Sequence, residues 1–263
     1  MVTVNLSAAY TALIPNAKIQ VLHEPGRKAK TDSRMWVYCT DKSAGRYIVL
    51  FDYSPTRNGD NAATFLGDYS RYLVCDGYDG YNKLENVTRC GCWAHARRKF
   101  VEALPTDKEL IPTSMAAKGV NLINEFYEIE RSFDGLTPEE KHKQRQEHLK
   151  PALHVFFAWL ETVNASSGTS LSKAVSYAIN EKKYLYRFLE SPYISIDNNM
   201  AENAIRPFVV GRKNWLFSNT QNGARASALI YSLAVTACAN GLNVENYFFR
   251  LLTSDEPVMP WNG

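Results

Sequence analysis

The segment Met35–Tyr53, MWVYCTDKSAGRYIVLFDY, contains the clearest strand signals in the chain. Met35–Thr40 and Tyr47–Tyr53 are both rich in aromatic and β-branched residues, and Asp41–Gly45 between them is turn-like. Two runs of this composition joined by a short turn are typical of an antiparallel hairpin. The segment therefore predicts two neighbouring antiparallel strands.

The flanking sequence extends this hairpin into a larger sheet. Upstream, Ile19–Glu24 (IQVLHE) alternates weakly and meets Pro25-Gly26, which predicts a strand ended by a turn. Downstream, short helices and strands alternate in the order helix Asn61–Leu66, strand Tyr72–Cys75, helix Tyr78–Leu84, strand Val87–Cys92 and helix Trp93–Leu104. This order predicts an α/β fold of the ribonuclease-H-like type, with a mixed five-stranded sheet whose first three strands are antiparallel.

The second half of the chain has helical patterns. Residues from about 105 to 190 carry no strand signal, so we expect an all-helical insertion. Asp197-Asn198-Asn199 can cap a helix that runs to about Ile205 and is disturbed at Pro207. Gly223–Ala239 should form a helix ended by Asn240-Gly241, and Val244–Leu252 a last short one. These patterns predict an atypical segment 1–18, a core 19–235 and a helical carboxyl-terminal segment 236–263.

Composition narrows the class of protein. Of 263 residues, 45% are hydrophobic and 22% are charged, which is ordinary for a globular domain. The formal net charge of +3 is mildly basic and compatible with nucleic-acid binding. Five cysteines, an odd number, favour a reduced, cytoplasmic chain. We expect no membrane partner, because no apolar run reaches bilayer length and the amino terminus lacks a signal-peptide pattern.

Two carboxylates stand at positions where a metal ion could bind. Asp76 directly follows the buried run Tyr72–Cys75, and ligands gather beyond the carboxyl ends of strands in open α/β sheets. Glu202 shares a helix face with Asn198 and Arg206, at steps of four residues. Taken alone, spacing favours structural interpretations of both residues: an Asp-Gly turn for Asp76, and an exposed ion pair with Arg206 for Glu202.

Cysteines and a histidine near Trp93 invite comparison with a zinc site. Cys90, Cys92 and His95 form the pattern C-x-C-x-x-H. A structural zinc site needs a fourth ligand, and no second Cys/His pair lies at a sensible distance along the chain. We therefore expect no structural zinc and interpret the thiols as small apolar core groups.

Two basic segments are candidates for DNA contact. One is AHARRKF, with His95, Arg97, Arg98 and Lys99; the other comprises Arg206, Arg212, Lys213 and Asn214, with Arg225 nearby. Clustered Arg and Lys side chains neutralise DNA phosphates, whereas a solvated helix face is the structural alternative. The combination of cations, an amide and an aromatic ring in GRKNW favours DNA for the second segment.

Together these motifs resemble the insertion-sequence 66 family of transposases. The resemblance spans about residues 19–252 and rests on a spaced series: QVLHEPGRKA from Gln20, YLVCDGYDGYNKL from Tyr72, RCGCWAHARRKF from Arg89, IDNNMAENAIRPFVVGRKNWLF from Ile196 and GARASALIYSLAVTACANGLNVENYFFRLL from Gly223. Each motif alone is weak evidence, but the series in this order is specific.

The resemblance implies a DDE active site in which carboxylates hold two divalent ions, Mg²⁺ or Mn²⁺, for in-line attack on a phosphodiester. By motif match, Asp76 is the second carboxylate and Glu202 the third. The implied partners are transposon ends and target DNA, approached by AHARRKF and GRKNW. The implied location is the bacterial cytoplasm, with the nucleoid when bound to DNA, and self-association into a homo-oligomer is compatible with it.

The first carboxylate is where the chain departs from the family. The family's Asp-Glu-Thr triplet falls on Pro15, Asn16 and Ala17, and none of these is acidic. The family's amino-terminal zinc-binding and DNA-binding region has no counterpart in the motifs above. We therefore expect a truncated or frame-disrupted copy with little or no strand transfer, unless Glu24, Asp52 or Asp197 supplies the missing carboxylate.

Two other functions remain open from the sequence. One is a non-catalytic DNA-binding or oligomerising remnant of a transposase. The other is an active ribonuclease-H-like nuclease with a different substrate, which requires three acids within roughly 4–5 Å of a shared metal pair.

Overall fold

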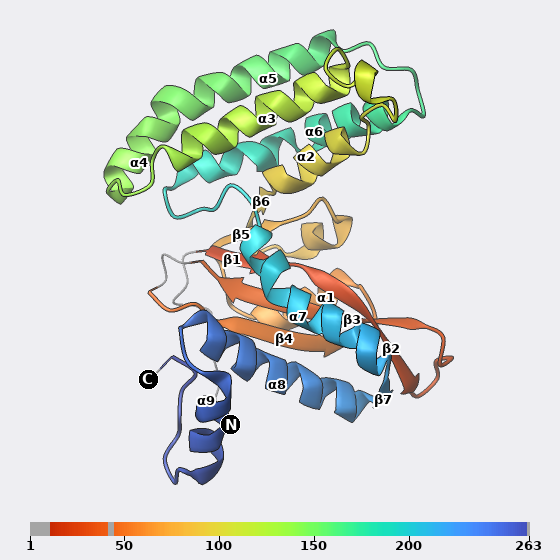
Figure 1. Ribbon diagram of the computed structural model, residues 1–263, viewed down its shortest axis with the longest axis vertical. Coiled ribbons are helices and arrows are strands. Elements are labelled where there is room, and N and C mark those ends of the chain that lie inside the picture. Colours follow the sequence, from red (N-terminus) through yellow and green to blue (C-terminus); the bar gives the residue numbers. More distant parts are fainter. Residues whose placement is uncertain (1–10, 42–44, 262–263) are drawn as a thin grey trace. The chain divides into compact units, whose positions relative to one another are not determined.

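The computed structural model describes residues 11–41 and 45–261, which form a mixed α/β structure (Figure 1). The strands are β1 (Thr11–Ile14), β2 (Asn16–His23), β3 (Asp32–Thr40), β4 (Val49–Ser54), β5 (Tyr72–Cys75), β6 (Thr88–Gly91) and β7 (Ser218–Thr220). The α-helices are α1 (Gly59–Leu66), α2 (Trp93–Val101), α3 (Met115–Arg131), α4 (Pro138–Gln144), α5 (Lys150–Thr162), α6 (Ser170–Tyr186), α7 (Asn199–Trp215), α8 (Gln221–Ala239) and α9 (Val244–Thr253). Short helical turns are η3 (Asp79–Lys83), η4 (Lys108–Leu110), η5 (Arg145–Leu149) and η6 (Arg187–Glu190).

The described residues fall into two compact units. The first unit comprises the described residues up to Leu73, Tyr78–Thr88 and the described residues from Asn198 onward. The second comprises Val74–Gly77 and Arg89–Asp197. The helical insertion expected between about residues 105 and 190 lies within the second unit.

Strand β3 is the centre of the sheet in the first unit. Strands β1 and β2 follow one another along one side of it and β4 lies on the other side, all antiparallel to β3. The predicted antiparallel arrangement of the first three strands is therefore present. Its first strand starts earlier than expected, because β2 begins at Asn16 and β1 precedes it. Pro15 separates the two because it has no N–H, although its carbonyl accepts a hydrogen bond from the Val37 amide (3.0 Å).

The remaining strands extend the sheet on the side of β1 and β2. In the order of the strands, β5 stands between β1 and β6. The first two residues of β5 belong to the first unit and the last two to the second. The parallel pairing of β7 with β2 joins Val21 to Ser218 and His23 to Thr220. This strand was not predicted, because three polar residues carry no alternation that could indicate a strand.

Helix α7 lies across one face of the strands of the first unit (Figure 1). The ring of Phe208 on α7 packs on Phe51 of β4, with 6.1 Å between ring centroids. The helix was expected to end near Ile205, and that prediction was wrong, since α7 continues through Pro207 to Trp215. Pro207 is exposed and removes a single backbone donor, while Ile205 and Phe208 on either side are buried and keep the helix on the sheet.

Helix α8 covers the edge of β4 (Figure 1). Three polar side chains spaced four residues apart make the contacts: Ser232 and Thr236 bond to β4, and Asn240, which caps the helix, donates to the Tyr47 carbonyl just before β4. The Ser232 hydroxyl accepts from the Phe51 amide (2.8 Å), and the Thr236 hydroxyl both accepts from and donates to the Val49 backbone (3.0 Å each). Four residues of a helix rise about 6 Å and two residues of a strand about 6.6 Å. Every fourth residue of the helix can therefore bond to every second residue of the strand. The helix thereby satisfies backbone groups that an edge strand would otherwise leave open.

The second unit is mainly helical, with α2, α3, α5 and α6 side by side (Figure 1). Trp93 is buried among Phe126, Phe156 and Phe157. Arg145 in the π-turn η5 is also buried; it pairs with Glu130 and donates to three backbone carbonyls, those of Phe188, Ser191 and Ile194. None of the described helices is long and apolar enough to cross a membrane.

Candidate active site

Asp76 follows β5 directly and belongs to the second unit. Its backbone is held in place because the Arg89 guanidinium donates to its carbonyl oxygen (3.3 Å). Arg89 itself forms a buried ion pair with Glu181 (2.6 Å). Burial, followed by the charges of Glu181 and Asp76 among others, raises the pKa of the Tyr177 hydroxyl, so a protonated tyrosine lies near Asp76.

Glu202 lies in the first turn of α7, in the first unit, and is half-buried. Its backbone amide donates to the Asn198 carbonyl (3.0 Å), and the buried Ala201 and Ile205 fix this part of the helix on the sheet. The two family-matched carboxylates thus stand on well-anchored backbone, each in its own unit.

The position expected for the first carboxylate lies at the break between β1 and β2. Pro15 stands opposite Val37, and Ala17 shares its face of the sheet because strand residues two apart point the same way. Val37 pairs with Phe51, whose ring packs on Phe208 of α7. Pro15 and Ala17 therefore lie on the face that α7 covers, and neither has a carboxylate.

Asp52 is on the opposite face. It pairs with Trp36 and follows Phe51, so it points away from the face that α7 covers. It lines a largely apolar cavity of about 570 Å³ between β4, α8 and α9, together with Leu50, Phe65, Leu233, Arg225 and Trp261 among others. Burial raises the pKa of Asp52 to about 6, against the lowering effect of the Arg225 charge.

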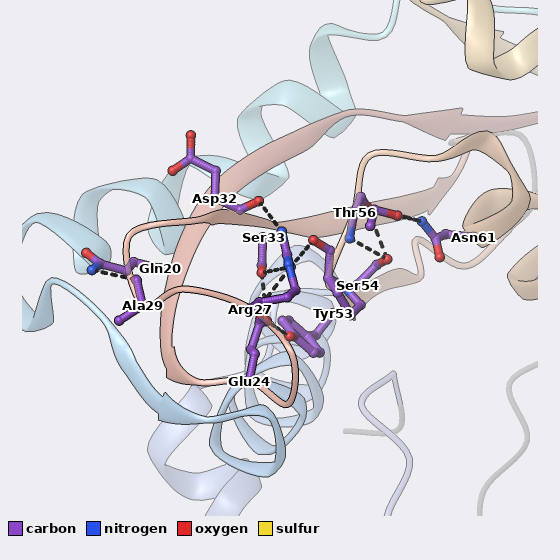
Figure 2. Close-up of polar contacts among 11 residues, drawn as sticks. Gln20, Glu24, Arg27, Ala29, Asp32, Ser33, Tyr53, Ser54, Thr56 and Asn61 are labelled. Carbon is purple, nitrogen blue, oxygen red and sulfur yellow. Dashed lines mark hydrogen bonds and ion pairs between the residues drawn. The ribbon is translucent and has the colours of Figure 1, made fainter.

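Glu24 follows β2 and is almost fully enclosed, with 1% of its side chain exposed. Figure 2 shows the donors that surround it. Arg27 forms an ion pair with the carboxylate (2.7 Å), the Ser33 hydroxyl donates to it (2.7 Å), and the Tyr53 hydroxyl donates to it as well. Burial, then the bond to Glu24, raises the pKa of Tyr53 to about 12, which keeps this donor protonated.

Arg27 links this cluster to the neighbouring loops. Its guanidinium also donates to Ser33 Oγ (2.8 Å), to the Pro55 carbonyl and to the Asp32 carbonyl (3.2 Å) (Figure 2). No local sequence signal indicates this cluster, because its members come from three separate segments. We name it the Glu24 cluster, comprising Glu24, Arg27, Ser33 and Tyr53.

Asp197, the third candidate replacement, is buried in the second unit. Burial, then the Asp197 charge, raises the pKa of Tyr127, so this hydroxyl stays protonated near the carboxylate. Carboxylate oxygens suit Mg²⁺ or Mn²⁺, but in residues 11–41 and 45–261 no group of three or more His, Cys, Asp or Glu side chains is arranged to hold a metal ion. The implied donor set is therefore incomplete.

The cysteines of the second unit are core groups. Cys75, Cys90 and Cys92 are buried thiols, and Cys75 Sγ donates weakly to the Cys90 carbonyl (3.9 Å). Burial raises the pKa of Cys90 to about 12, which disfavours the thiolate that a metal would need.

The basic side chains of α2 have partners within the second unit. Arg97 donates to the Asn124 side chain on α3 (2.7 Å), and Lys99 pairs with Glu102 (3.3 Å). His95 is half-buried, and Arg98 is exposed. The structure thus uses part of this set to join helices.

The basic side chains of α7 lie in the first unit and differ in their surroundings. Arg206, Lys213 and Asn214 are exposed. The Arg212 guanidinium donates to the Lys18 carbonyl. The pKa of Asp32 is held below its usual value mainly by the Lys18 ammonium, with smaller effects from Arg34 and Arg212. Arg212 therefore helps to join α7 to β2.

Comparison with known proteins identifies a family and relatives that match most of this sequence. The family model described as "Transposase IS66 family" matches residues 4–226, so it starts before the first recognisable motif at about residue 19. Uncharacterized protein y4qI of Sinorhizobium fredii is 30% identical over 90% of this chain and 48% of its own length. Uncharacterized protein y4hP of the same organism is 29% identical over 88% of this chain and 47% of its own length.

The chain therefore spans about half the length of these curated relatives. No solved structure matches it. Because the family model covers most of the sequence, the chain belongs to the IS66 family of transposases.

Proposed function

We propose that this chain is a DDE-type transposase core of an insertion sequence that binds DNA but performs little or no strand transfer. Family membership supports a transposase-type function. The strand arrangement supports a ribonuclease-H-like core, because β1, β2 and β4 are antiparallel to β3, all four precede β5, and β5 lies beside β1. A protein with this role would work in the cytoplasm, on transposon ends and target DNA.

Asp76 and Glu202 are the proposed second and third carboxylates. Bound Mg²⁺ or Mn²⁺ would stabilise the attacking and leaving oxygens of a phosphodiester. With two of the three expected acids the donor set does not fit a metal pair, so we assign no catalytic step to this chain.

The observation that carries the proposal is the pair Pro15 and Ala17 on the face of the sheet that α7 covers. Glu202 belongs to α7, so a carboxylate at position 15 would lie on the same side of the sheet as this helix. The alternative acids of the first unit do not replace it: Asp52 is on the opposite face, and Glu24 is surrounded by three donors of its own cluster.

The test combines DNA binding with strand transfer by the purified chain. We expect affinity for transposon-end DNA to fall linearly with salt on a log–log plot, because Lys and Arg displace phosphate counterions. We expect no joined or cleaved product with Mg²⁺ or Mn²⁺. Joined product from the unaltered chain would contradict the proposed impairment, and the absence of salt-dependent binding would contradict the DNA-binding role.

A second candidate is a non-catalytic DNA-binding remnant that can mix with intact transposase subunits. It is favoured by one feature of the sequence: from Asn203 to Val244 there are four cations, Arg206, Arg212, Lys213 and Arg225, and no Asp or Glu. A basic segment of this kind binds phosphates without any catalytic group. Strand transfer after restoration of the first acid would argue against this candidate.

A further inference from the structure

The end of α7 contains a strained turn. Leu216 has φ 64° and ψ −47°, and the Phe217 amide donates to the Trp215 carbonyl (2.8 Å). These values describe a γ-turn with a positive central φ, which is rare and strained. Within the described residues, Leu216 is the one non-glycine residue with a positive φ. Strain of this kind persists only where the surrounding structure enforces it, and it is concentrated at functional sites.

The turn is enforced from both sides. Before it, the Trp215 ring packs on the buried Phe208 (5.5 Å between ring centroids), and the Leu216 amide donates to the Arg212 carbonyl (2.9 Å). After it, Ser218 is buried and pairs with Val21 of β2. A rigid frame therefore holds two consecutive residues, Leu216 and Phe217, in a fixed conformation.

These two side chains are nevertheless open to solvent. Leu216 is 63% exposed and Phe217 is 43% exposed. Exposed Lys213 and Asn214 precede them in the same turn region, and the acid-free stretch Asn203–Val244 contains them. Two exposed apolar side chains can contact an aromatic group, and the basic stretch without carboxylates can attract an anion. Together they suit a ligand that is both anionic and aromatic. Nucleic acid with an unstacked base has both properties.

We propose that Leu216 and Phe217 form an apolar wedge that contacts an unstacked base at a DNA end, while Lys213 and Arg206 contact the adjacent phosphates. The inference rests on the proposed DNA-binding function and adds the residues that contact a base. Leu and Phe are among the side chains that proteins insert between base steps, and an aromatic ring stacks on any base. The proposal therefore predicts preference for frayed or unpaired ends without sequence specificity at this contact.

The experiment uses the full chain and two DNA probes, a blunt duplex and a duplex with one frayed end that carries 2-aminopurine. With wild-type protein we expect aminopurine fluorescence to change on binding and the frayed probe to bind more tightly. Phe217→Ala should abolish the fluorescence change and weaken frayed-end binding roughly tenfold, about 1.4 kcal/mol, with little effect on the blunt probe. Phe217→Tyr should retain both signals, because a phenol ring also stacks.

Three further variants separate stacking from charge, strain and general exposure of aromatic groups. Lys213→Ala should weaken both probes alike and reduce the salt slope by about one, leaving the fluorescence change intact. Leu216→Gly should raise the melting temperature, because it relieves the positive φ, and still weaken frayed-end binding. Phe249→Ala, at an aromatic residue 68% exposed on α9, is the matched control and should change neither signal.

The outcomes are distinguishable. If wild-type protein binds neither probe, the proposed function fails and this inference fails with it. If it binds both probes equally and without a fluorescence change, the inference alone is wrong. If Phe217→Ala leaves DNA binding intact and instead shifts the sedimentation coefficient, the exposed pair is a contact between protein copies, which overturns the proposal.

Discussion

Two acidic residues of the first unit, Glu24 and Asp52, were both candidates to replace the missing carboxylate, and the structure treats them in opposite ways. Glu24 is enclosed by an ion pair with Arg27 and by the hydroxyls of Ser33 and Tyr53. Asp52 faces a largely apolar cavity, with Arg225 among its lining residues, and burial raises its pKa to about 6. Burial disfavours the ionised form of a carboxyl group, and the raised pKa of Asp52 shows this effect where donors are few. Around Glu24, by contrast, three donors are arranged.

The comparison explains why neither acid is suited to hold a catalytic metal. The oxygens of Glu24 already accept from three groups that hold together the loop after β2 and the strands β3 and β4. Asp52 lies on the face of the sheet opposite α7. Variants of Glu24, Ser33 and Asp52 test this difference.

Glu24→Ala should have the largest effect. It leaves Arg27 without its buried counter-charge and the Ser33 and Tyr53 hydroxyls without their acceptor, so we expect a loss of about 3–5 kcal/mol in the free energy of unfolding. Denaturant unfolding measures it. Glu24→Gln, which keeps an acceptor oxygen, should lose less. A variant as stable as wild type would show that the Glu24 cluster does not stabilise the fold.

Ser33→Ala tests the same cluster through one hydroxyl. Ser33 donates to Glu24 and accepts from Arg27, and its removal leaves a buried carboxylate with one donor fewer. We expect the free energy of unfolding to fall by about 1–3 kcal/mol. Ser54→Ala is a suitable control, because this buried hydroxyl donates to the Thr56 carbonyl (3.1 Å) outside the cluster. If both variants lost the same free energy of unfolding, the bond from Ser33 to Glu24 would have no special importance for stability.

Asp52→Asn should change the free energy of unfolding least of the three. At high pH it should raise this free energy, whereas the other two variants lower it. The pKa of Asp52 in the folded protein, about 6, lies above its ordinary value of 3.8. The stability that the protonated acid contributes is therefore complete below pH 3.8 and is lost as pH rises through 6. Asparagine carries no charge at any pH. The melting temperature of the variant should therefore rise relative to that of wild type between pH 4 and pH 8. Asp68→Asn, at a carboxylate exposed to solvent, is the control measured beside it.

Local patterns predicted much of the fold and less of the site. The apolar composition of Tyr72–Cys75 predicts the strand that ends at Cys75. The pair Asn240-Gly241 predicts the end of the helix before it, and Gly241 indeed has a φ of 80°. Strand β7 could not be predicted, because it exists only through pairing with Val21 and His23 about 200 residues away.

Side-chain partners were the least predictable feature. The Glu24 cluster depends on the fold bringing Tyr53, 29 residues away, to the end of β2, which no local signal specifies. By contrast, the side of the sheet on which Asp52 lies follows from strand alternation once the register with β3 is known.

We proposed that this chain performs little or no strand transfer because position 15 has no carboxylate. The most direct measurement is Mg²⁺-dependent strand transfer by Pro15→Asp, with Asn16→Asp as the matched control on the opposite face of the sheet. We expect product from Pro15→Asp and none from Asn16→Asp or wild type, with salt-dependent DNA binding unchanged in all three. Product from wild-type protein, or equal product from both variants, would contradict the claim.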